Sequence, residues 1–570
     1  MKYISSFDIF DTCLVRKCGT PENFFDVFSL RAFNHEPPEW ARQEFVAARR
    51  IAERKAGEIN PSYTLQDIWT KFEWEYPFLK TKMEIVRLEQ DLEREMLMPV
   101  LEMRDKVNAC RKHGDKIIFI SDMYLSSEFL ISAMRGCGFY QDGDSLYVSC
   151  ECKARKSDGN LFHYVREKEG LKSYHHWHHY GDNKIGDFMV PRELGIKCTL
   201  INHEYTPYQK QWKDNDYSLG FKYPSILAGI GRALHYSTEW TTHTDFVLDI
   251  IAPFYCSLVY RMMKDAQQSG IKRLYFCARD AYMMYKIALL YKQLFPAIEC
   301  KFLYISRKAL YEGDDEAKIA YYEQIGLATK NDYVGIVDIR SSGKTLIQIN
   351  KILKSHGCKP IRGYYYMLYS DGGDGIDYLI NDAYYEVSQR YNSKLASINN
   401  RFCVLFERFF PLNNLSKTKG YKANSNGDIK PVFCTEADVD IESESEIIED
   451  IKHWSKIHEE LISIFTISYI QLYLYQYSDY IFNISINTIY HFLEKPAKSY
   501  LMALQCLSIH YTYPNLHILP FVSKLSFIQI IKTRGKHTGW KMGTLVLSNY
   551  EKIYNLFSKI KAELKLRDII

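Results

Sequence analysis

Alternating strand and helix segments between residues 116 and 203 constrain the fold more than any other feature of the sequence. Short apolar runs predict four strands there, at residues 116–122, 144–149, 177–182 and 197–203. Amphipathic segments with a helical period separate the strands. Such repeated units form a parallel, doubly wound sheet, because each strand must be reached by a crossover helix. The apolar segment 2–7, which ends at Asp8, adds a further strand, so the predicted class is α/β.

A long helical segment separates the first strand from the others. Apolar residues recur with a helical period over residues 20–110, and charged residues occupy the outer faces. We therefore predict a helical insert over about residues 16–110. It interrupts an N-terminal domain that spans residues 1–205.

The rest of the chain is long enough for two further domains, since domains of about 100–200 residues are usual. A second series of strands and helices predicts another α/β domain over residues 240–410. Residues 440–570 are aromatic-rich and show helical periodicity, so we expect a helical C-terminal domain.

The net charge and the cysteine content limit which partners and which cellular compartment we expect. The formal net charge of +4 over 570 residues gives no bulk attraction to nucleic acid or anionic membranes, so neither is expected as a partner. The 14 cysteines include no Cys-x-x-Cys pair, and the N-terminal segment does not resemble a signal peptide. We expect a cytoplasmic protein with reduced cysteines.

One uncharged stretch, residues 461–478, invites comparison with a membrane helix. It contains two glutamines and several serines and threonines. A membrane span needs about 20 mostly apolar residues. We therefore expect a buried, aromatic-rich helix, and neither a transmembrane segment nor peripheral membrane contact.

Four polar segments follow predicted strands, at the edge where parallel sheets bind ligands. They lie at residues 7–12, 119–122, 156–159 and 181–183, with Asp187 a few residues beyond the last. A carboxylate at a strand end can attack phosphorus, and further carboxylates can bind Mg²⁺. A hydroxyl and a lysine can neutralise phosphoryl oxygens. These parts are supplied, in that order, by Asp8, by Asp182 and Asp187, and by Ser121 and Lys156.

The order and spacing of these segments resemble the four motifs of the haloacid dehalogenase superfamily, over residues 1 to about 203. The resemblance implies that Asp8 is the nucleophile, Ser121 the second-motif hydroxyl and Lys156 the third-motif lysine. It implies that Asp182 and Asp187 bind Mg²⁺ together with Asp8 and the backbone carbonyl of Phe10. The helical insert then corresponds to the family's cap, which covers the site and excludes water.

Phe10 departs from the pattern of the family's phosphatases, which carry an aspartate two residues after the nucleophile. An aromatic residue there is more similar to the dehalogenase branch, which attacks carbon without a metal. Asp11 either serves as a displaced acid or caps the following turn, and the cap is favoured. The retained carboxylates Asp182 and Asp187 would repel Asp8 without a cation, which favours magnesium and phosphoryl chemistry.

The function favoured by these residues is magnesium-dependent hydrolysis of a small phosphorylated metabolite through an aspartyl-phosphate. The overall layout resembles large hydrolases of bacterial polysaccharide-biosynthesis clusters, which suggests a sugar phosphate as substrate. One alternative is a metal-independent, dehalogenase-like hydrolase. Another is a non-hydrolytic head coupled to a C-terminal domain that binds phosphate or nucleotide or acts as a transferase.

A second candidate site lies in residues 334–345, where a hydrophobic strand runs into a small-residue loop that opens a helix. Backbone N–H groups of such a loop can bind phosphate. The segment resembles the phosphoribosyl-pyrophosphate loop of type I phosphoribosyltransferases, although Val337 replaces one of its acids. An ordinary strand–loop–helix turn is the alternative. The candidate residues are Asp338, Ser341, Ser342, Gly343, Lys344 and Thr345, with Arg279 from an upstream turn.

Overall fold

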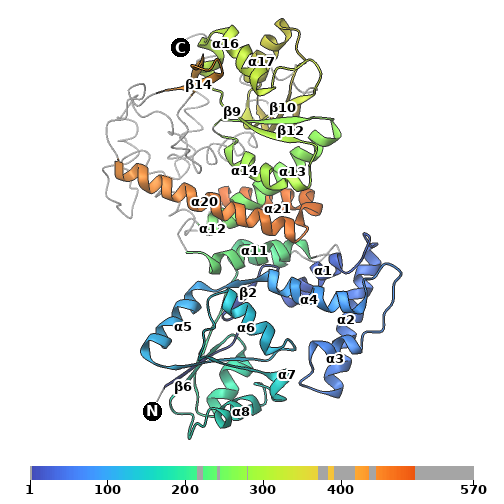
Figure 1. Cartoon of the computed structure of the whole chain (residues 1–570), viewed down its shortest axis with the longest axis vertical. Helices are drawn as coiled ribbons and strands as arrows, with labels where there is room; N and C mark the ends of the chain where they lie inside the picture. The colour runs from blue at the N-terminus through green and yellow to red at the C-terminus, as the bar shows by residue number, and fades with distance from the viewer. Residues whose placement is uncertain are drawn as a thin grey trace. The chain divides into compact units, whose positions relative to one another are not determined.

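The computed structural model divides the chain into two compact units, each built on a five-stranded parallel sheet (Figure 1). The first unit comprises Met1–Thr241 and Ser468–Gln476, and the second comprises Thr242–Ile467 and Tyr477–Ile570. The predicted α/β class is therefore confirmed. The structure describes residues 3–214, 222–239, 244–278, 280–369, 383–389, 418–434 and 445–494.

The sheet of the first unit has the order β5-β4-β1-β6-β7, with every neighbouring pair parallel. Its strands match the apolar runs of the sequence: β1 (Ile4–Phe7), β4 (Lys116–Ser121), β5 (Ser145–Val148), β6 (Trp177–Gly181) and β7 (Lys197–Leu200). All four residues of the central strand β1 are buried, as expected for a strand flanked on both sides and covered on both faces.

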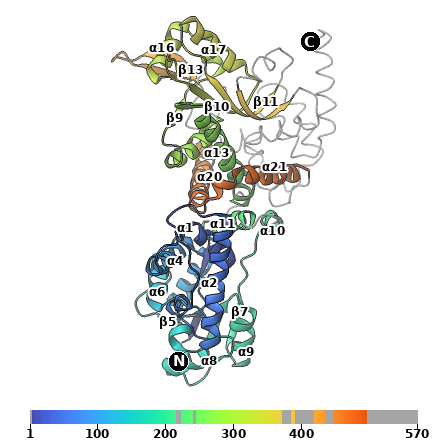
Figure 2. The same ribbon diagram turned by 90° about the vertical axis from the view of Figure 1, so that its right-hand side faces the viewer.

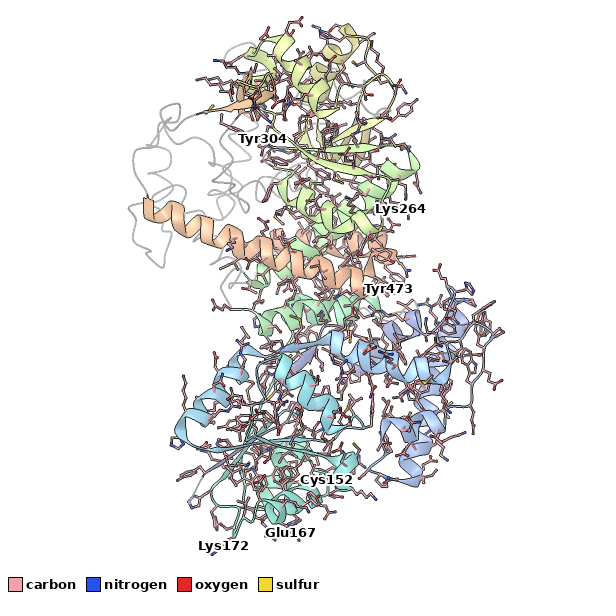
Figure 3. All side chains as sticks on the ribbon, viewed as in Figure 1. Cys152, Glu167, Lys172, Lys264, Tyr304 and Tyr473 are labelled. Carbon is pink, nitrogen blue, oxygen red and sulfur yellow. The ribbon has the colours of Figure 1, made fainter. Side chains whose placement is uncertain are left out.

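Helices follow the strands in the predicted alternation. They are α5 (Leu101–His113), α6 (Ser127–Gly136), α7 (Ser149–Cys152), α8 (Asn160–Lys168), the π-helical turn η1 (Lys184–Met189) and α9 (Val190–Glu193). Helix α8 packs its apolar side, including Phe162, against Ile118 and Trp177 of the sheet. Cys152, at the end of α7, is labelled in Figure 3, and like the other described cysteines it forms no disulfide.

The predicted helical insert lies between two short strands, β2 (Leu14–Arg16) and β3 (Leu97–Pro99), which pair antiparallel. It contains α1 (Pro21–Arg31), α2 (Glu39–Ile59), α3 (Leu65–Thr70) and α4 (Lys82–Met96). Capping boxes at Thr64 and Thr81 begin α3 and α4. The sequence predicted that the insert extends to residue 110, but β3 separates α4 from α5. A three-residue strand is too short to interrupt a helical pattern visibly in the sequence, so the two helices looked like one segment.

A buried ion pair holds the insert together and joins it to the sheet domain. Arg49 of α2 is fully buried and donates two hydrogen bonds to Glu89 of α4, at 2.6 and 3.2 Å. Trp69 of α3 donates to the same carboxylate at 2.7 Å. Tyr124, in the loop after β4, donates to it at 3.4 Å, and its carbonyl accepts from the Leu65 backbone N–H. The helical insert is therefore hydrogen bonded to the loop that follows β4.

Two later segments complete the first unit beyond residue 205, where the sequence predicted its first domain to end. Helices α10 (Pro207–Asp214) and α11 (Tyr223–Ser237) follow β7, and α11 packs against β2 and β3. The end of α20 (Ser445–Gln471) also belongs to this unit. There Gln471 hydrogen bonds Lys17 at 3.2 Å and Arg31 at 2.8 Å.

The second unit has the strand order β12-β11-β10-β8-β9, also parallel throughout. Three of these strands, β9, β10 and β11, are labelled in Figure 2. The strands are β8 (Arg273–Cys277), β9 (Glu299–Leu303), β10 (Val334–Ser341), β11 (Arg362–Tyr369) and β12 (Ala383–Gln389). The antiparallel strands β13 (Thr418–Ala423) and β14 (Ile429–Phe433) form a separate two-stranded sheet in the same unit. Strand β9 ends at Leu303, and the side chain of Ser306 caps the helix that begins at Arg307.

The helices of the second unit include a long helix before β8 and part of the predicted helical C-terminal region. They are α12 (Thr244–Phe246), η2 (Val247–Ile251), α13 (Ala252–Gln268), α14 (Tyr282–Leu290), η3 (Tyr291–Gln293), α15 (Arg307–Glu312), α16 (Asp315–Ile325), α17 (Lys344–Ser355), most of α20, and α21 (Ser478–Glu494). The predicted region beyond residue 494 lies outside the described residues.

The uncharged stretch 461–478 is not one continuous helix. Helix α20 ends at Gln471, Tyr473 (labelled in Figure 3) has a positive φ of 58°, and the 3-10 turn η5 (Leu474–Tyr477) follows. Within the described part of the chain, one helical stretch, Thr244–Gln268, is long and apolar enough to cross a membrane, and 89% of its most apolar window is buried. Core helices pass the same test of length and composition.

Candidate active site

The site is built at the carboxyl edge of the first sheet, where β1 and its two neighbours end together. Asp8 follows the last residue of β1, and its backbone N–H donates to the Tyr180 carbonyl of β6 at 2.8 Å. Ser121 is the last residue of β4, the neighbour on the other side, and is 1% exposed. Parallel register thus brings these two predicted residues to one edge although they are far apart in sequence.

Three carboxylates converge at this edge. Oxygens of Asp8, Asp182 and Asp187 all lie within 4.8 Å of one another. Asp8 and Asp187 are buried, and Asp182 is the least buried of the three. Oxygen donors at this spacing fit a Mg²⁺ ion, which prefers carboxylate ligands. The sequence expectation that these acids meet is therefore matched by their geometry.

The position of Asp187 depends on the turn that follows β6. The side chain of Asn183 caps η1 by accepting from the backbone N–H groups of Ile185 and Gly186, both at 2.9 Å. The Asn183 N–H in turn donates to Asp187 at 3.0 Å. Gly181 lies directly against the Asp187 carboxyl, and a Cβ at position 181 would collide with it. The glycine therefore makes room for the carboxylate.

Lys156 joins two of the three acids. Its Nζ donates to Asp8 at 2.5 Å and to Asp187 at 2.6 Å, and its side chain is 5% exposed. The Lys156 backbone N–H donates to both oxygens of Asp122, at 3.0 Å each, which anchors the lysine loop to the loop after β4. The segment that begins at Lys156 is thus hydrogen bonded to the loop that follows Ser121.

The charges of the site are strongly coupled. Burial raises the pKa of Asp8 well above its ordinary value, with Lys156 opposing and Asp187 adding to the shift. Burial together with Asp11 and Asp187 raises the pKa of Asp182 to about 6. Burial acts the same way on Asp187, but Lys156 and His179 lower its pKa below the ordinary range. One lysine therefore does not neutralise all three carboxylates, and a divalent cation would.

His179, which the sequence did not single out as a site residue, supports Asp187 from β6. Its Nε2 lies 3.1 Å from Asp187 Oδ1, and its Nδ1 lies 2.7 Å from Ser6 Oγ on β1. Trp177 donates to the same serine hydroxyl at 2.6 Å. The signal in the sequence was a run of four histidines and a tryptophan before the fourth motif. The strand register that pairs His179 with Ser6 could not be read from that run.

The loop after Asp8 turns back on itself. Phe10 forms a bridge with Leu14, and the Asp11 N–H donates to the Leu14 carbonyl at 2.7 Å. The Arg16 guanidinium lies over the Phe10 ring, 4.5 Å from its centre. The Asp11 carboxyl accepts from Arg232 of α11 at 2.7 Å, so among the described residues its partner is this guanidinium and not the backbone of the turn. The favoured reading of Asp11 as a turn cap is not what the geometry gives.

The second candidate segment forms the predicted strand, loop and helix. Asp338, Ser341, Ser342, Gly343, Lys344 and Thr345 lie at the end of β10 and the start of α17. Gly343 has a positive φ of 81°, and its N–H donates to Ser341 Oγ at 3.0 Å. The Ile339 N–H donates to Asp338 at 2.8 Å. The side chains of Asp338 and Ser341 thus accept from backbone N–H groups of their own segment, and Arg279 lies outside the described residues.

No family model and no curated protein matches the chain. Several solved structures match about a third of it. The HAD-hydrolase YfnB from Bacillus subtilis, bound to magnesium, is 16% identical with a TM-score of 0.27, covering 36% of this chain and 90% of that one. A dehalogenase with an intermediate complex is 11% identical with a TM-score of 0.27, at 36% and 87% coverage.

A HAD family enzyme from Bacteroides thetaiotaomicron, in complex with magnesium and inorganic phosphate, is 15% identical with a TM-score of 0.25. It covers 35% of this chain and 95% of that one. At such identities and scores these similarities do not decide the chemistry. Function is therefore inferred from the geometry of the site.

Proposed function

We propose that this protein is a magnesium-dependent phosphohydrolase that acts on a small phosphorylated metabolite through an aspartyl-phosphate intermediate. The observation that carries the proposal is the meeting of Asp8, Asp182 and Asp187 with the buried cation of Lys156 at one sheet edge. A nucleophilic carboxylate, an oxygen-ligand set for Mg²⁺ and a fixed positive charge are the parts that phosphoryl transfer needs.

Asp8, Asp182, Asp187 and the Phe10 carbonyl would hold the metal ion, which supplies charge neutralisation for the phosphoryl oxygens when bound. An oxygen of Asp8 attacks phosphorus, and the bond from phosphorus to the leaving oxygen breaks. Lys156 and the Ser121 hydroxyl stabilise the charge on the transferred group. Water then attacks the phosphorus of the acyl phosphate, which releases inorganic phosphate and restores Asp8.

The leaving oxygen has no carboxylic acid at position 10, where Phe10 lies under Arg16. In this proposal it takes its proton from solvent, which is slow for poor leaving groups. The enzyme should therefore favour phosphates with acidic leaving groups. The loose resemblance of the chain's layout to hydrolases of polysaccharide-biosynthesis clusters makes sugar phosphates the first natural substrates to test.

The decisive assay measures phosphate release from p-nitrophenyl phosphate and a panel of sugar phosphates, with Mg²⁺ and with EDTA. Asp8→Asn is the matched control, because it removes the nucleophile at nearly constant volume. Activity that requires both Mg²⁺ and Asp8 supports the proposal. Wild-type rates equal to those of the D8N variant on every phosphate would overturn it.

Phe10 favours a second candidate, a metal-independent hydrolase that attacks carbon and releases halide. The three converging carboxylates count against it, because nothing in carbon attack requires them to share a cation. Halide release from 2-haloacids in EDTA would establish this candidate. A third, in which the head only binds and the second unit acts on phosphate at residues 341–345, predicts a bound phosphate mimic on that loop and none on Asp8.

A further inference from the structure

The turn that follows the nucleophile has an unusual backbone. Asp11 has a φ of 52°, in the left-handed region that residues with a Cβ rarely adopt. The next residue, Thr12, places its hydroxyl 3.4 Å from the carboxylate of Asp182. The shape of this turn is therefore connected directly to the candidate metal ligands on both of its sides, Asp8 and Asp182.

Arg232 is the side chain that fixes this turn. It lies on α11, which follows the last strand of the sheet, and is 7% exposed. Its Nη2 donates to Asp11 at 2.7 Å and to the Gly19 carbonyl at 3.0 Å. Its guanidinium also lies 4.8 Å from the centre of the Tyr205 ring. The Arg232 guanidinium thus bonds both ends of residues 11–19. This segment is the first crossing, that is, the first of the two connections between the sheet and the helical insert.

Close packing of α11 against the first crossing fixes the position of Arg232. Gly229 lies so close to the backbone of Cys18 and Gly19 that a Cβ would collide with it. Ser225 accepts from the Asn23 side chain at 2.9 Å. Together with Arg232 these contacts form a row along one side of α11, from residue 225 to residue 232, against the crossing.

We propose that Arg232 is a positioning residue of the active site, which holds the Asp11 turn so that Asp8, the Phe10 carbonyl and Asp182 keep the geometry of a divalent-metal site. The inference rests on the proposed metal site of the phosphohydrolase. Residues beyond the predicted hydrolase domain of 1–205 are then part of the catalytic scaffold. Arg232 acts through Asp11 and Thr12 and does not touch substrate.

The test measures Mn²⁺ binding to the full-length protein by electron paramagnetic resonance, alongside Mg²⁺-dependent phosphatase kinetics. Arg232→Gln should weaken Mn²⁺ binding about tenfold, the lower end for residues that orient metal ligands. Arg232→Lys, which keeps the charge, should recover most of the affinity. Arg31→Gln is the matched control, because Arg31 forms a partly buried ion pair with Glu95, at an N···O distance of 2.6 Å, and does not bond Asp11. It should leave Mn²⁺ affinity unchanged.

If Arg232→Gln does not fold, judged by circular dichroism, Asp11→Asn breaks the same ion pair from the other partner and should weaken Mn²⁺ binding similarly. Wild-type Mn²⁺ affinity in the folded R232Q or D11N variants would overturn the inference, as would an equal loss in R31Q. A protein that binds Mn²⁺ in an Arg232-dependent way but hydrolyses no phosphate would refute the proposed function and keep the positioning role. A wild type that binds no Mn²⁺ would refute both.

Discussion

The Nε2 atom of His179 lies 3.1 Å from Oδ1 of Asp187, inside a fully buried row of hydrogen bonds. Burial lowers the pKa of His179, so the ring is neutral near pH 7. Its Nε2–H then donates to Asp187, and its Nδ1 accepts from Ser6, whose hydroxyl accepts from Trp177. In the proposed metal site, His179 would be an outer residue that orients the carboxylate of Asp187.

Substitution of His179 should weaken the metal site without removing a ligand. We expect His179→Ala to reduce Mg²⁺ affinity or activity about 10–100-fold, as is usual for such outer partners. The measurement is the Mg²⁺ concentration that gives half-maximal activity. His178→Ala is the control, because His178 bonds Thr199 and Tyr180 and not Asp187. Equal Mg²⁺ dependence in H179A and wild type would contradict the prediction.

Lys156 should be required for stability as well as for turnover. Lys156→Met leaves Asp8 and Asp187 buried without their cation, and breaking such a pair costs about 3–5 kcal/mol. Urea unfolding without metal should show this loss. Saturating Mg²⁺ should stabilise K156M more than wild type, because the ion replaces the missing charge. A variant that unfolds like wild type in EDTA would count against the buried pair.

Gly181→Ala tests whether the Asp187 carboxyl fits its place because residue 181 lacks a side chain. The added methyl meets that carboxyl, so we expect a loss of about 1–3 kcal/mol in stability and weaker Mg²⁺ binding. Gly136→Ala is the control, since a Cβ there meets nothing within 4 Å. Chemical denaturation and Mg²⁺ titration measure the two effects, and parallel behaviour of the two variants would refute the explanation.

Much of this site could be predicted because its parts sit at strand ends. Parallel strands end at one edge, so the polar residues after residues 7, 121 and 181 had to meet, and their identities suggested the chemistry. The sequence could not show Arg232 against Asp11, or Gln471 against Arg31. These partners lie 221 and 440 residues apart, and no local period records them.

The prediction that Asp11 caps its own turn failed, because a contact from a distant helix replaced the local hydrogen bonds. A carboxylate at the start of a turn is usually satisfied by the turn's own backbone N–H groups. At Asp11 the guanidinium of α11 takes that place. In the histidine run that precedes Asp182, both ring nitrogens of His178 and of His179 have hydrogen-bond partners. What the run could not reveal was that one of those bonds reaches Asp187.

His178 gives a pH-dependent stability. Burial, together with Lys197 and Lys106, lowers its pKa from 6.5 to about 4. Between pH 6.5 and 4 the unfolded chain gains a proton there that the folded protein does not, so this residue lowers stability as pH falls through that window. We expect the melting temperature of His178→Gln to fall less steeply over that window than that of wild type. His35→Gln, at an exposed position, should follow wild type.

The phenylalanine at position 10 predicts an unusual dependence on the leaving group. Without an adjacent acid, rates should rise steeply as the leaving alcohol becomes more acidic. A series of substituted phenyl phosphates measures this slope, and Phe10→Asp should flatten it if Arg16, which covers the ring, leaves the new carboxyl free to donate. A flat slope in wild type would show that another group protonates the leaving oxygen.

Residues 468–476 belong to the first unit, although most of the second unit precedes them in the chain. This affects the order in which the protein can fold during synthesis. Asp8, Asp182, Asp187 and Arg232 of α11 are all synthesised before residue 240. The partner of Lys17 and Arg31, however, is synthesised only after the whole sheet of the second unit. At about 5–20 residues per second, this delay is on the order of ten seconds or more. During that time the nascent N-terminal unit lacks this partner beside its helical insert, and a ribosome that stops early releases a first unit without residues 468–476.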